Sequence, residues 1–292
     1  MSADAAGPTA RLLIGLIGAG IGRSLTPAMH EEEARHHGLT LYDQLIDLDR
    51  TQAGAEVLPS LLRAMRTIGF AGFNVTHPCK QAILPLLDEL SSEARAIGAV
   101  NTVVVRDGRF IGHNTDSSGW AWAFRRALPE ADLTHVVLLG AGGAGSAIAH
   151  ALLRLGAQTL TIVDTERARA LTLASELDRL YGRGRVQCDA DVASALPYAS
   201  GLVHATPTGS DHSPGMPLAA ALLTPNLWVS EIVYFPLRTE LLEAARAAGC
   251  AVSDGGGMAV GQAIDAFRLF TGREADISRV ERHFRRLIAE RR

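Results

Sequence analysis

The chain has 292 residues, of which 47% are hydrophobic and 20% charged, so it can bury the cores of two ordinary domains. Its net charge is −3 and its arginines are scattered, which argues against nucleic acid or a membrane as the main partner. Three cysteines, Cys79, Cys188 and Cys250, are too few and too far apart for a disulfide framework. The first residues lack a basic region followed by an apolar core, so we expect no secretion signal and a cytoplasmic protein.

A glycine-rich turn, Gly18 to Gly22, follows the first expected strand, Leu12 to Ile17, and resembles a nucleotide-binding turn. Thr26 is expected to cap the next helix, with Pro27 as its first residue, so that helix begins too late to hold a pyrophosphate. Two interpretations of Ser24 and Thr26 stay open. They cap the helix only, or their hydroxyls bind a small, oxygen-rich ligand.

Strands and helices alternate in the next section, with a strand expected at 40–48, a helix at 55–68 and a strand at 70–75. Lys80 lies in the first turn of a short helix that runs to Leu87. It is the only lysine among 28 basic side chains, at a helix position where the dipole disfavours a cation. Unlike arginine, lysine can lose its proton when partly buried, which suggests a chemical role for Lys80.

Two further polar residues follow the next elements, which are a helix at 91–97, a strand at 99–105, a turn at 107–108 and a helix at 119–128. Asn101 lies in the expected strand, and Asp116 stands just before the last helix. Asp116 alone would be interpreted as a helix cap. Because Lys80, Asn101 and Asp116 all lie near strand ends, where open α/β sheets bind ligands, we expect one site.

Residues 136–164 form one strand, turn, helix and strand unit. Gly140, Gly142 and Gly145 satisfy G-x-G-x-x-G behind an apolar strand, and the following helix stops at Gly156. The second strand ends in Asp164, at the offset where an acidic side chain accepts hydrogen bonds from an adenosine ribose. This unit predicts a dinucleotide-binding domain.

The remaining elements continue the alternation, with helices at 167–180, 239–248, 255–270 and 277–288 and strands at 186–188, 202–205, 228–234 and 250–253. We therefore predict an α/β fold of two domains. An N-terminal α/β domain spans 1–115 and is joined by the C-terminal helices 260–292, and a doubly wound Rossmann-type domain spans 116–259. The ten histidines form no metal-binding motif, so no metal is expected.

Over nearly its whole length the chain resembles the shikimate and quinate dehydrogenase family. The resemblance rests on six motifs: Ser24 to Pro27, Asn74 to Lys80, Gly98 to Thr102, Gly112 to Asp116, the Gly140 unit, and Gly257-Met258 with Gln262-Ala263. It implies a substrate domain that binds a polyhydroxylated cyclohexane carboxylate. It also implies hydride transfer to a nicotinamide cofactor across the cleft between the domains.

The resemblance further implies a role for each matching residue. Lys80 and Asp116 correspond to the catalytic pair, which supplies the base that oxidation of a secondary alcohol requires. The substrate-binding positions are Ser24 and Thr26 for the carboxylate and Thr76, Asn101, Tyr234 and Gln262 for the ring. The cofactor-binding positions are Gly140, Gly142, Gly143, Ala144, Gly145, Asp164, Arg169, Thr206, Ile232, Gly255 and Met258.

The chain departs from the biosynthetic shikimate enzymes, which use NADP. Asp164 replaces their usual Asn, and its charge would repel the 2′-phosphate, so NAD is favoured, although Arg167 and Arg169 oppose this. His204 and Glu231 replace the family's usual Asn and Asp. The alternatives are an NADP-dependent shikimate dehydrogenase, an aminoshikimate-type dehydrogenase, and an inactive sensor of quinate. Quinate and shikimate are the expected partners of a monomer or homodimer.

Overall fold

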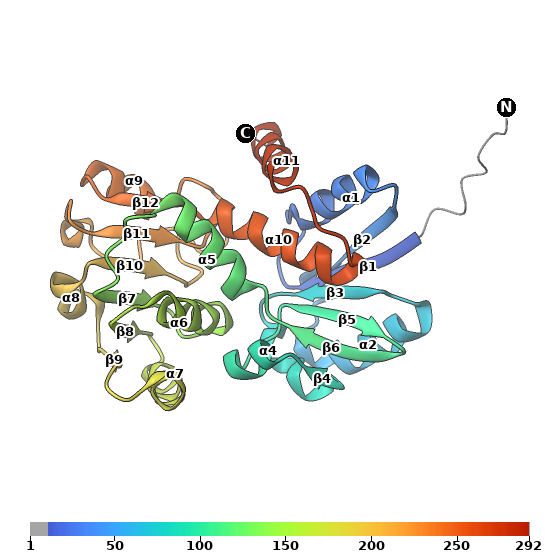
Figure 1. Ribbon diagram of the computed structural model, residues 1–292, viewed down its shortest axis with the longest axis horizontal. Coiled ribbons are helices and arrows are strands. Elements are labelled where there is room, and N and C mark those ends of the chain that lie inside the picture. Colours follow the sequence, from blue (N-terminus) through green and yellow to red (C-terminus); the bar gives the residue numbers. More distant parts are fainter. Residues whose placement is uncertain (1–10, 292) are drawn as a thin grey trace. The chain divides into compact units, whose positions relative to one another are not determined.

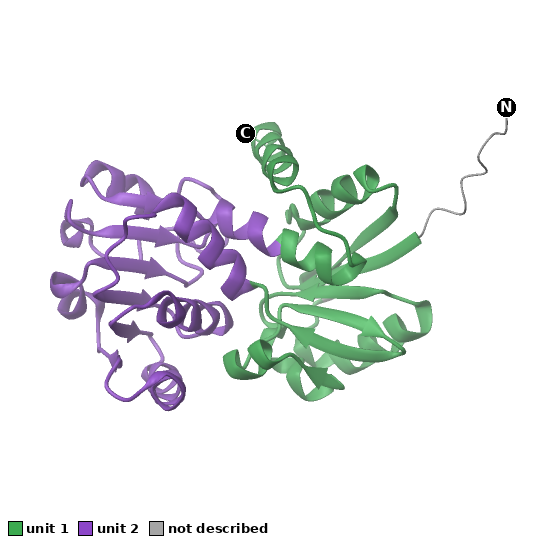
Figure 2. Cartoon of the chain, in the orientation of Figure 1, with its two compact units in different colours: residues 1–115, 263–292 green, residues 116–262 purple. Residues whose placement is uncertain are grey.

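The computed structural model describes residues 11–291 (Figure 1). The stretch on which the absence of a secretion signal was predicted lies almost wholly outside them. The chain divides into two compact units, one of Met1–Thr115 with Ala263–Arg292 and one of Asp116–Gln262, which we call unit 1 and unit 2 (Figure 2). The chain enters unit 2 at Asp116 and leaves it after Gln262, where the sequence placed this border after residue 259.

Unit 2 is built on a six-stranded parallel sheet. Its strands are β7 (His135–Leu139), β8 (Thr159–Val163), β9 (Val186–Cys188), β10 (Gly201–His204), β11 (Trp228–Glu231) and β12 (Ala251–Ser253). The order β12-β11-β10-β7-β8-β9 is that of a doubly wound fold, with the reversal between β7 and β10. The predicted Rossmann-type topology is therefore confirmed, and the carboxyl ends of β7 and β10 mark its ligand crevice.

Helices cover both faces of this sheet. The elements are α5 (Asp116–Ala127), α6 (Gly143–Leu155), α7 (Arg167–Tyr181), α8 (Val192–Ala195), η4 (Leu196–Tyr198), η5 (Ala220–Leu222) and α9 (Glu240–Ala247). Leu138 packs in one apolar core with Ile148 of α6, whereas its neighbour Leu139 packs with Leu241 of α9 in another. Because successive strand residues point to opposite faces, β7 contributes to both cores.

Unit 1 contains a mixed sheet in the order β2-β1-β3-β5-β6-β4. Its strands are β1 (Arg11–Gly18), β2 (Thr40–Asp47), β3 (Gly72–Val75), β4 (Glu89–Leu90), β5 (Thr102–Arg106) and β6 (Arg109–His113). β1 runs parallel to β2 and β3, while β5 is antiparallel to β3 and β6. The β5–β6 hairpin turns at Asp107 and Gly108, which both have positive φ, as the sequence predicted.

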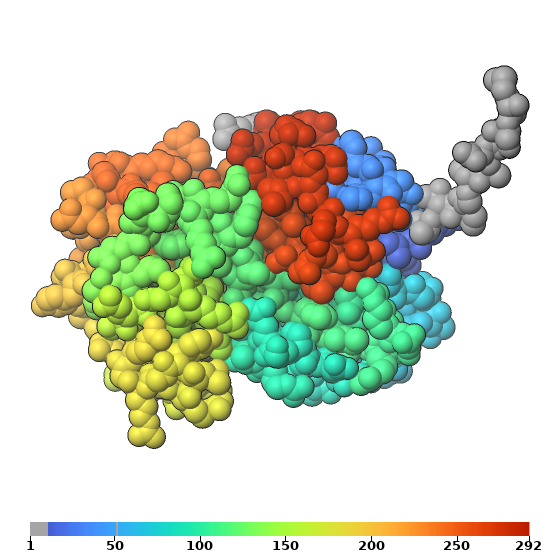
Figure 3. All heavy atoms as spheres, viewed as in Figure 1, coloured from blue at the N-terminus to red at the C-terminus, as the bar shows by residue number. Residues whose placement is uncertain are grey.

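The helices of unit 1 also lie on both faces of its sheet. They are α1 (Thr26–His36), η1 (Leu48–Thr51), η2 (Ala55–Val57), α2 (Leu58–Ile68), α3 (Cys79–Ala82), η3 (Leu84–Leu86), α4 (Ser92–Ile97), α11 (Ile277–Glu290) and, from Ala263 onward, α10 (Gly255–Thr271), whose first half belongs to unit 2. Leu62 of α2 packs with Phe73 in one core, and Phe267 of α10 packs with Ile14 in the other. α11 lies beside α1, where both helices reach the surface shown in Figure 3.

Several boundaries differ from the sequence-based expectations. The helix expected to run to Leu87 ends at Ala82 and is followed by η3, and the strand expected at 99–105 begins at Thr102. Leu25, not Thr26, occupies the cap of α1, and no side-chain capping bond forms there, because Thr26 already has its place in the helix. β11 ends at Glu231, three residues before the expected end at Tyr234, because the Glu231 carboxylate accepts the N–H groups of Ile232 and Val233 and turns the chain out of the sheet. Among residues 11–291, no helix is both long and apolar enough to cross a membrane.

Candidate active site

The glycine-rich turn of unit 2 has the backbone geometry that a dinucleotide requires. Gly140 has φ +105°, and a Cβ on it would lie 2.6 Å from the carbonyl oxygen of Ala205, so only glycine fits. A Cβ on Gly145 would overlap the Gly140 carbonyl. Gly142 has open space around its Cα, and α6 begins at Gly143, with Ala144 in its first turn. Open backbone N–H groups at this helix start fit a pyrophosphate.

Asp164 stands at the end of β8 beside that turn. Its Oδ2 accepts the N–H of Ala141 at 2.7 Å, and its Oδ1 accepts the N–H of Glu166 at 2.8 Å. These bonds fix the carboxylate next to the glycine-rich turn, with lone pairs left over for ribose hydroxyls. Arg169 instead pairs with the side chain of Glu166 at 2.5 Å, where both side chains are more than half exposed.

The other residues assigned to the cofactor are Thr206 and Ile232, which follow β10 and β11, and Gly255 and Met258, which lie in the first turn of α10. The methyl group of Thr206 would be 3.1 Å from a Cβ on Gly140, so Thr206 borders the glycine-rich turn. The carbonyl oxygens of Ile232 and Val233 lie directly against Gly255, which leaves no room for a side chain. Met258 differs from this group, because its side chain is buried in the core beneath α5 and α6.

Unit 1 gathers its own polar residues at the carboxyl ends of β1 and β3. The N–H of Thr76 donates to Ile17 at 2.9 Å, and the N–H of Val100 donates to the carbonyl of Lys80, also at 2.9 Å. Lys80 is half-buried on α3. Thr76 directly follows β3, Lys80 lies in α3, and Asn101 stands just before β5, outside the strand in which it was expected.

Ser24 and Thr26 lie on the loop after β1 and at the start of α1. The Ser24 hydroxyl accepts the N–H of Thr26 at 3.3 Å, and both residues are half-buried. The N–H of Ala19 donates to the carbonyl of His77 at 2.9 Å and ties this loop to the segment that carries Thr76. The loop hydroxyls and Thr76 therefore belong to one edge of the unit 1 sheet.

Asn101 holds the residue that precedes Asp116. Its Oδ1 accepts the N–H of Thr115 at 2.8 Å, and its Nδ2 donates to the Thr115 hydroxyl at 3.0 Å. Asp116 is fully buried at the start of α5, where its Oδ1 accepts a hydrogen bond from Gln262 Nε2. The sequence singled out Asn101, Asp116 and Gln262 but missed Thr115. Its position between Asn114 and Asp116 in one motif was the only signal.

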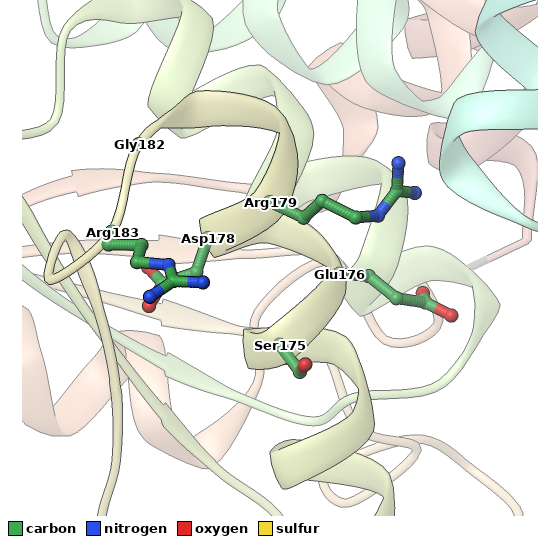
Figure 4. A pocket seen from close by; sticks show the side chains of 6 residues that line it. All are labelled: Ser175, Glu176, Asp178, Arg179, Gly182 and Arg183. Carbon is green, nitrogen blue, oxygen red and sulfur yellow. The ribbon is translucent and has the colours of Figure 1, made fainter.

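Two further features, the Cys79 thiol and a hollow on α7, are not assigned to the site. Burial raises the pKa of the Cys79 thiol to about 11, so the neighbour of Lys80 is no nucleophile at neutral pH. A surface hollow of about 830 Å³ lies at the end of α7 (Figure 4), lined by Ser175, Glu176, Asp178, Arg179, Gly182 and Arg183. Its Glu176 and Arg179 side chains extend to the same side in Figure 4, and the Asp178 carboxylate accepts the N–H groups of Gly184 and Val186.

Comparison with known proteins identifies the family. Residues 16–103 match the model of the shikimate dehydrogenase substrate-binding domain, and residues 255–283 match that of the shikimate 5′-dehydrogenase C-terminal domain. A shikimate dehydrogenase (NADP⁺) of Streptomyces avermitilis is 57% identical over 92% of this chain and 93% of its own. The chain belongs to the shikimate dehydrogenase family.

Two other relatives of this family carry quinate in their names. A quinate/shikimate dehydrogenase (NAD⁺) of Corynebacterium efficiens is 47% identical over 94% of this chain and 97% of its own. The structure of quinate dehydrogenase from Corynebacterium glutamicum in complex with NAD has a TM-score of 0.88 and 45% identity, and covers 95% of this chain and 100% of its own. The chain is thus an oxidoreductase of the shikimate/quinate dehydrogenase type with a pyridine nucleotide cofactor.

Proposed function

We propose that this enzyme oxidises quinate and shikimate to their 3-dehydro acids with NAD as the preferred cofactor. The observation that carries the NAD preference is Asp164, a carboxylate fixed beside the glycine-rich turn by bonds to Ala141 and Glu166. A 2′-phosphate at the ribose would meet this negative charge. Arg169, one of the two arginines that could bind such a phosphate, is paired with Glu166.

Lys80 and Asp116 are the proposed acid/base pair. Oxidation of a secondary alcohol releases a hydride from carbon, which the bound nicotinamide ring accepts, and a proton from oxygen. Lys80 in its neutral form accepts that proton. The Asp116 carboxylate orients the amine and balances the positive charge that the amine then carries. The bond from Gln262 and the anchoring of Thr115 by Asn101 hold Asp116 in one orientation. Lysine is suited to this work because its amine can exist in both protonation states.

The ring acid is proposed to bind at the polar edge of unit 1. Ser24 and Thr26 hold the carboxylate, and Thr76 and Asn101, with Tyr234 and Gln262 from unit 2, contact the ring. Quinate carries a hydroxyl on the carbon that bears the carboxylate, where shikimate has a double bond. Thr26 adds a methyl group to the hydroxyl that a serine would supply, and a methyl-sized difference changes a pocket's preference by only about 1 to 3 kcal/mol. We therefore expect both acids to react.

A two-by-two matrix of kcat/KM, with quinate and shikimate against NAD and NADP, tests this function. We expect turnover of both acids, with the higher values for NAD. Equal or higher values for NADP would show that the naming of the Streptomyces avermitilis relative is the better guide and that Asp164 does not select the cofactor. In Thr26→Ser, the ratio of kcat/KM for shikimate to that for quinate should be higher than in wild type. An unchanged ratio removes Thr26 as the selector.

Absence of turnover with all four combinations would contradict the proposal and favour a ligand sensor.

The compartment is proposed to be a reducing one, the cytoplasm, because Cys79, Cys188 and Cys250 are all free. Oxidation of quinate would then supply a catabolic route, and reduction of the 3-dehydro acid would supply aromatic amino acid biosynthesis.

A further inference from the structure

Three side chains of unit 2 form a hydrogen-bonded chain at the carboxyl ends of β10 and β11. His204 Nδ1 lies 2.9 Å from Glu231 Oε1 and 3.0 Å from Oε2, and His204 Nε2 lies 2.5 Å from the Thr206 hydroxyl. His204 and Glu231 are paired in register as the last residues of the two strands. Both side chains are fully buried, whereas Thr206 at the end of the chain is only half-buried.

The donors around Glu231 set the direction of its bond to His204. Its carboxylate accepts the N–H groups of Ile232 at 2.8 Å and Val233 at 2.9 Å and the Thr239 hydroxyl at 3.2 Å. A carboxylate that receives only donors must also receive the proton of His204 Nδ1. In the neutral ring, Nε2 is then an acceptor, and the Thr206 hydroxyl donates to it. This is the order of bonds by which a carboxylate and a histidine orient a hydroxyl in hydrolases.

The hydroxyl oxygen of Thr206 can accept a hydrogen bond at the edge of the proposed cofactor site. Its oxygen accepts the N–H of Thr208 at 3.3 Å, and because its proton is directed to His204, the remaining lone pair can only accept. Its methyl group borders Gly140 of the glycine-rich turn. At the other end of the chain, Glu231 bonds to Ile232, whose carbonyl lies against Gly255.

We propose that His204 and Glu231 are positioning residues for the cofactor. They direct the Thr206 hydroxyl as a hydrogen-bond acceptor toward a donor of the nicotinamide half of the dinucleotide, a ribose hydroxyl or the carboxamide NH₂. Replacing a buried histidine–carboxylate pair by two apolar side chains of similar volume is often neutral or stabilising. The pair is therefore poorly explained by stability alone. His204 and Glu231 both differ from the Asn and Asp of the resembling family, which fits residues that act as a pair. The inference rests on the dinucleotide site proposed above.

NADH affinity, measured by fluorescence titration of the purified protein without ring acid, tests the proposal independently of catalysis. We expect Thr206→Val to raise the Kd for NADH about five- to tenfold, the effect of one lost hydrogen bond, and Thr206→Ser to leave it unchanged. His204→Asn should weaken NADH by a similar factor. The double variant His204→Asn/Thr206→Val should be no weaker than Thr206→Val alone, because both changes act through one hydroxyl.

Three controls separate positioning from stability and from the proposed reaction. His150→Asn removes another buried histidine of unit 2, bonded to Tyr181, and should lower Tm without changing the Kd for NADH. In turnover assays the KM for the dinucleotide should rise in the Thr206 and His204 variants while the KM for the ring acid stays constant. The ¹⁵N spectrum of His204, assigned by its loss in His204→Asn, should show a neutral ring protonated at Nδ1.

Several outcomes would overturn the inference. One is a wild-type Kd for NADH in Thr206→Val, and another is a raised Kd in Thr206→Ser. The others are additive losses of affinity in the double variant, and a His204→Asn protein with a lowered Tm but an unchanged Kd for NADH. A doubly protonated His204 at neutral pH would also contradict it. If wild type binds NADH but oxidises neither acid, the proposed function fails while this inference stands.

Discussion

Within residues 11–291, each unit has a histidine–carboxylate pair in which both side chains are almost fully buried, and the two pairs differ in what the second ring nitrogen contacts. In unit 1, His30 Nδ1 lies 2.8 Å from Asp43 Oδ2, and its Nε2 lies 3.2 Å from the carbonyl oxygen of Ala263 in α10. The backbone carbonyl at the second nitrogen can only accept, so Nε2 of His30 must donate the hydrogen bond to Ala263. In unit 2, the second nitrogen of His204 faces a hydroxyl, which can donate, and the neutral ring is satisfied.

The difference shows how the same pair of side chains serves two purposes. The pair His30–Asp43 ends on a helix backbone and attaches α10 to the sheet of unit 1, so we expect it to affect stability alone. The pair His204–Glu231 ends on a side chain at the cofactor edge, so we expect it to affect binding. In general, variants of unit 1 should change turnover or stability without changing NADH affinity, whereas variants beside the glycine-rich turn should change NADH affinity.

The largest expected effect is on turnover, from Lys80 in unit 1. Lys80→Met removes the proposed base and should lower kcat by about 10² to 10⁴ while leaving the Kd for NADH unchanged. Lys80→Arg is the matched control, because it keeps the positive charge but cannot release its proton, and it should be nearly as slow. Stopped-flow measurement of NADH formation checks both. Near-normal turnover in Lys80→Met would remove Lys80 from the reaction, whereas near-normal turnover in Lys80→Arg alone would mean that Lys80 supplies only charge.

The next effect concerns the stability of unit 1. His30→Leu leaves Asp43 buried without its partner and should lower the free energy of unfolding by about 3 to 5 kcal/mol, measured by urea denaturation. Asp43 Oδ1 already lacks a partner among the described residues. His30→Leu/Asp43→Leu should therefore recover most of the loss. NADH affinity should stay constant in both variants, and a changed Kd would break the distinction drawn between the two pairs.

The sequence predicted the glycine-rich turn and the position of Asp164 directly after β8, because these depend on local spacing. It could not predict the pairing of His204 with Glu231. Those residues are 27 positions apart, and their contact depends on the register of two parallel strands. The early end of β11 has the same origin, since the Glu231 carboxylate binds the next two N–H groups. The role of Thr115 was also missed, because its bonds to Asn101 cross between separate loops.

A smaller effect on stability is expected at Glu33 in α1, and it depends on pH. Burial alone would raise the pKa of Glu33, but the hydrogen bonds and charge of Arg279, with bonds from the Asp276 N–H and His37, outweigh it and lower the pKa below its ordinary 4.5. A lowered pKa adds stability that is fully present above pH 4.5 and is lost as the pH falls through the folded-state value.

Glu33→Gln should therefore lower the free energy of unfolding by about 2 kcal/mol at pH 7, and the difference from wild type should shrink in acid. Glu32→Gln is the matched control, because the ion pairs of Glu32 are with the exposed Arg35 and His36, and it should cost about 0.5 kcal/mol or less. Denaturation curves between pH 7 and pH 3 check the sign. A difference that grows in acid would show that Arg279 does not stabilise the ionised form.

The smallest expected effect, about 1 kcal/mol, concerns cofactor choice in unit 2. Asp164→Asn keeps one side-chain oxygen that can accept the N–H of Ala141 or Glu166, but it removes the charge that would oppose a 2′-phosphate. The ratio of kcat/KM for NAD to that for NADP should therefore fall about fivefold. Glu166→Gln is the control. It removes a neighbouring exposed carboxylate that pairs with Arg169, and so tests whether a released Arg169 binds the 2′-phosphate of NADP. If Glu166→Gln improves NADP more than Asp164→Asn does, then release of Arg169, rather than the charge on Asp164, governs the choice, and the cofactor preference depends on α7 instead of the glycine-rich turn.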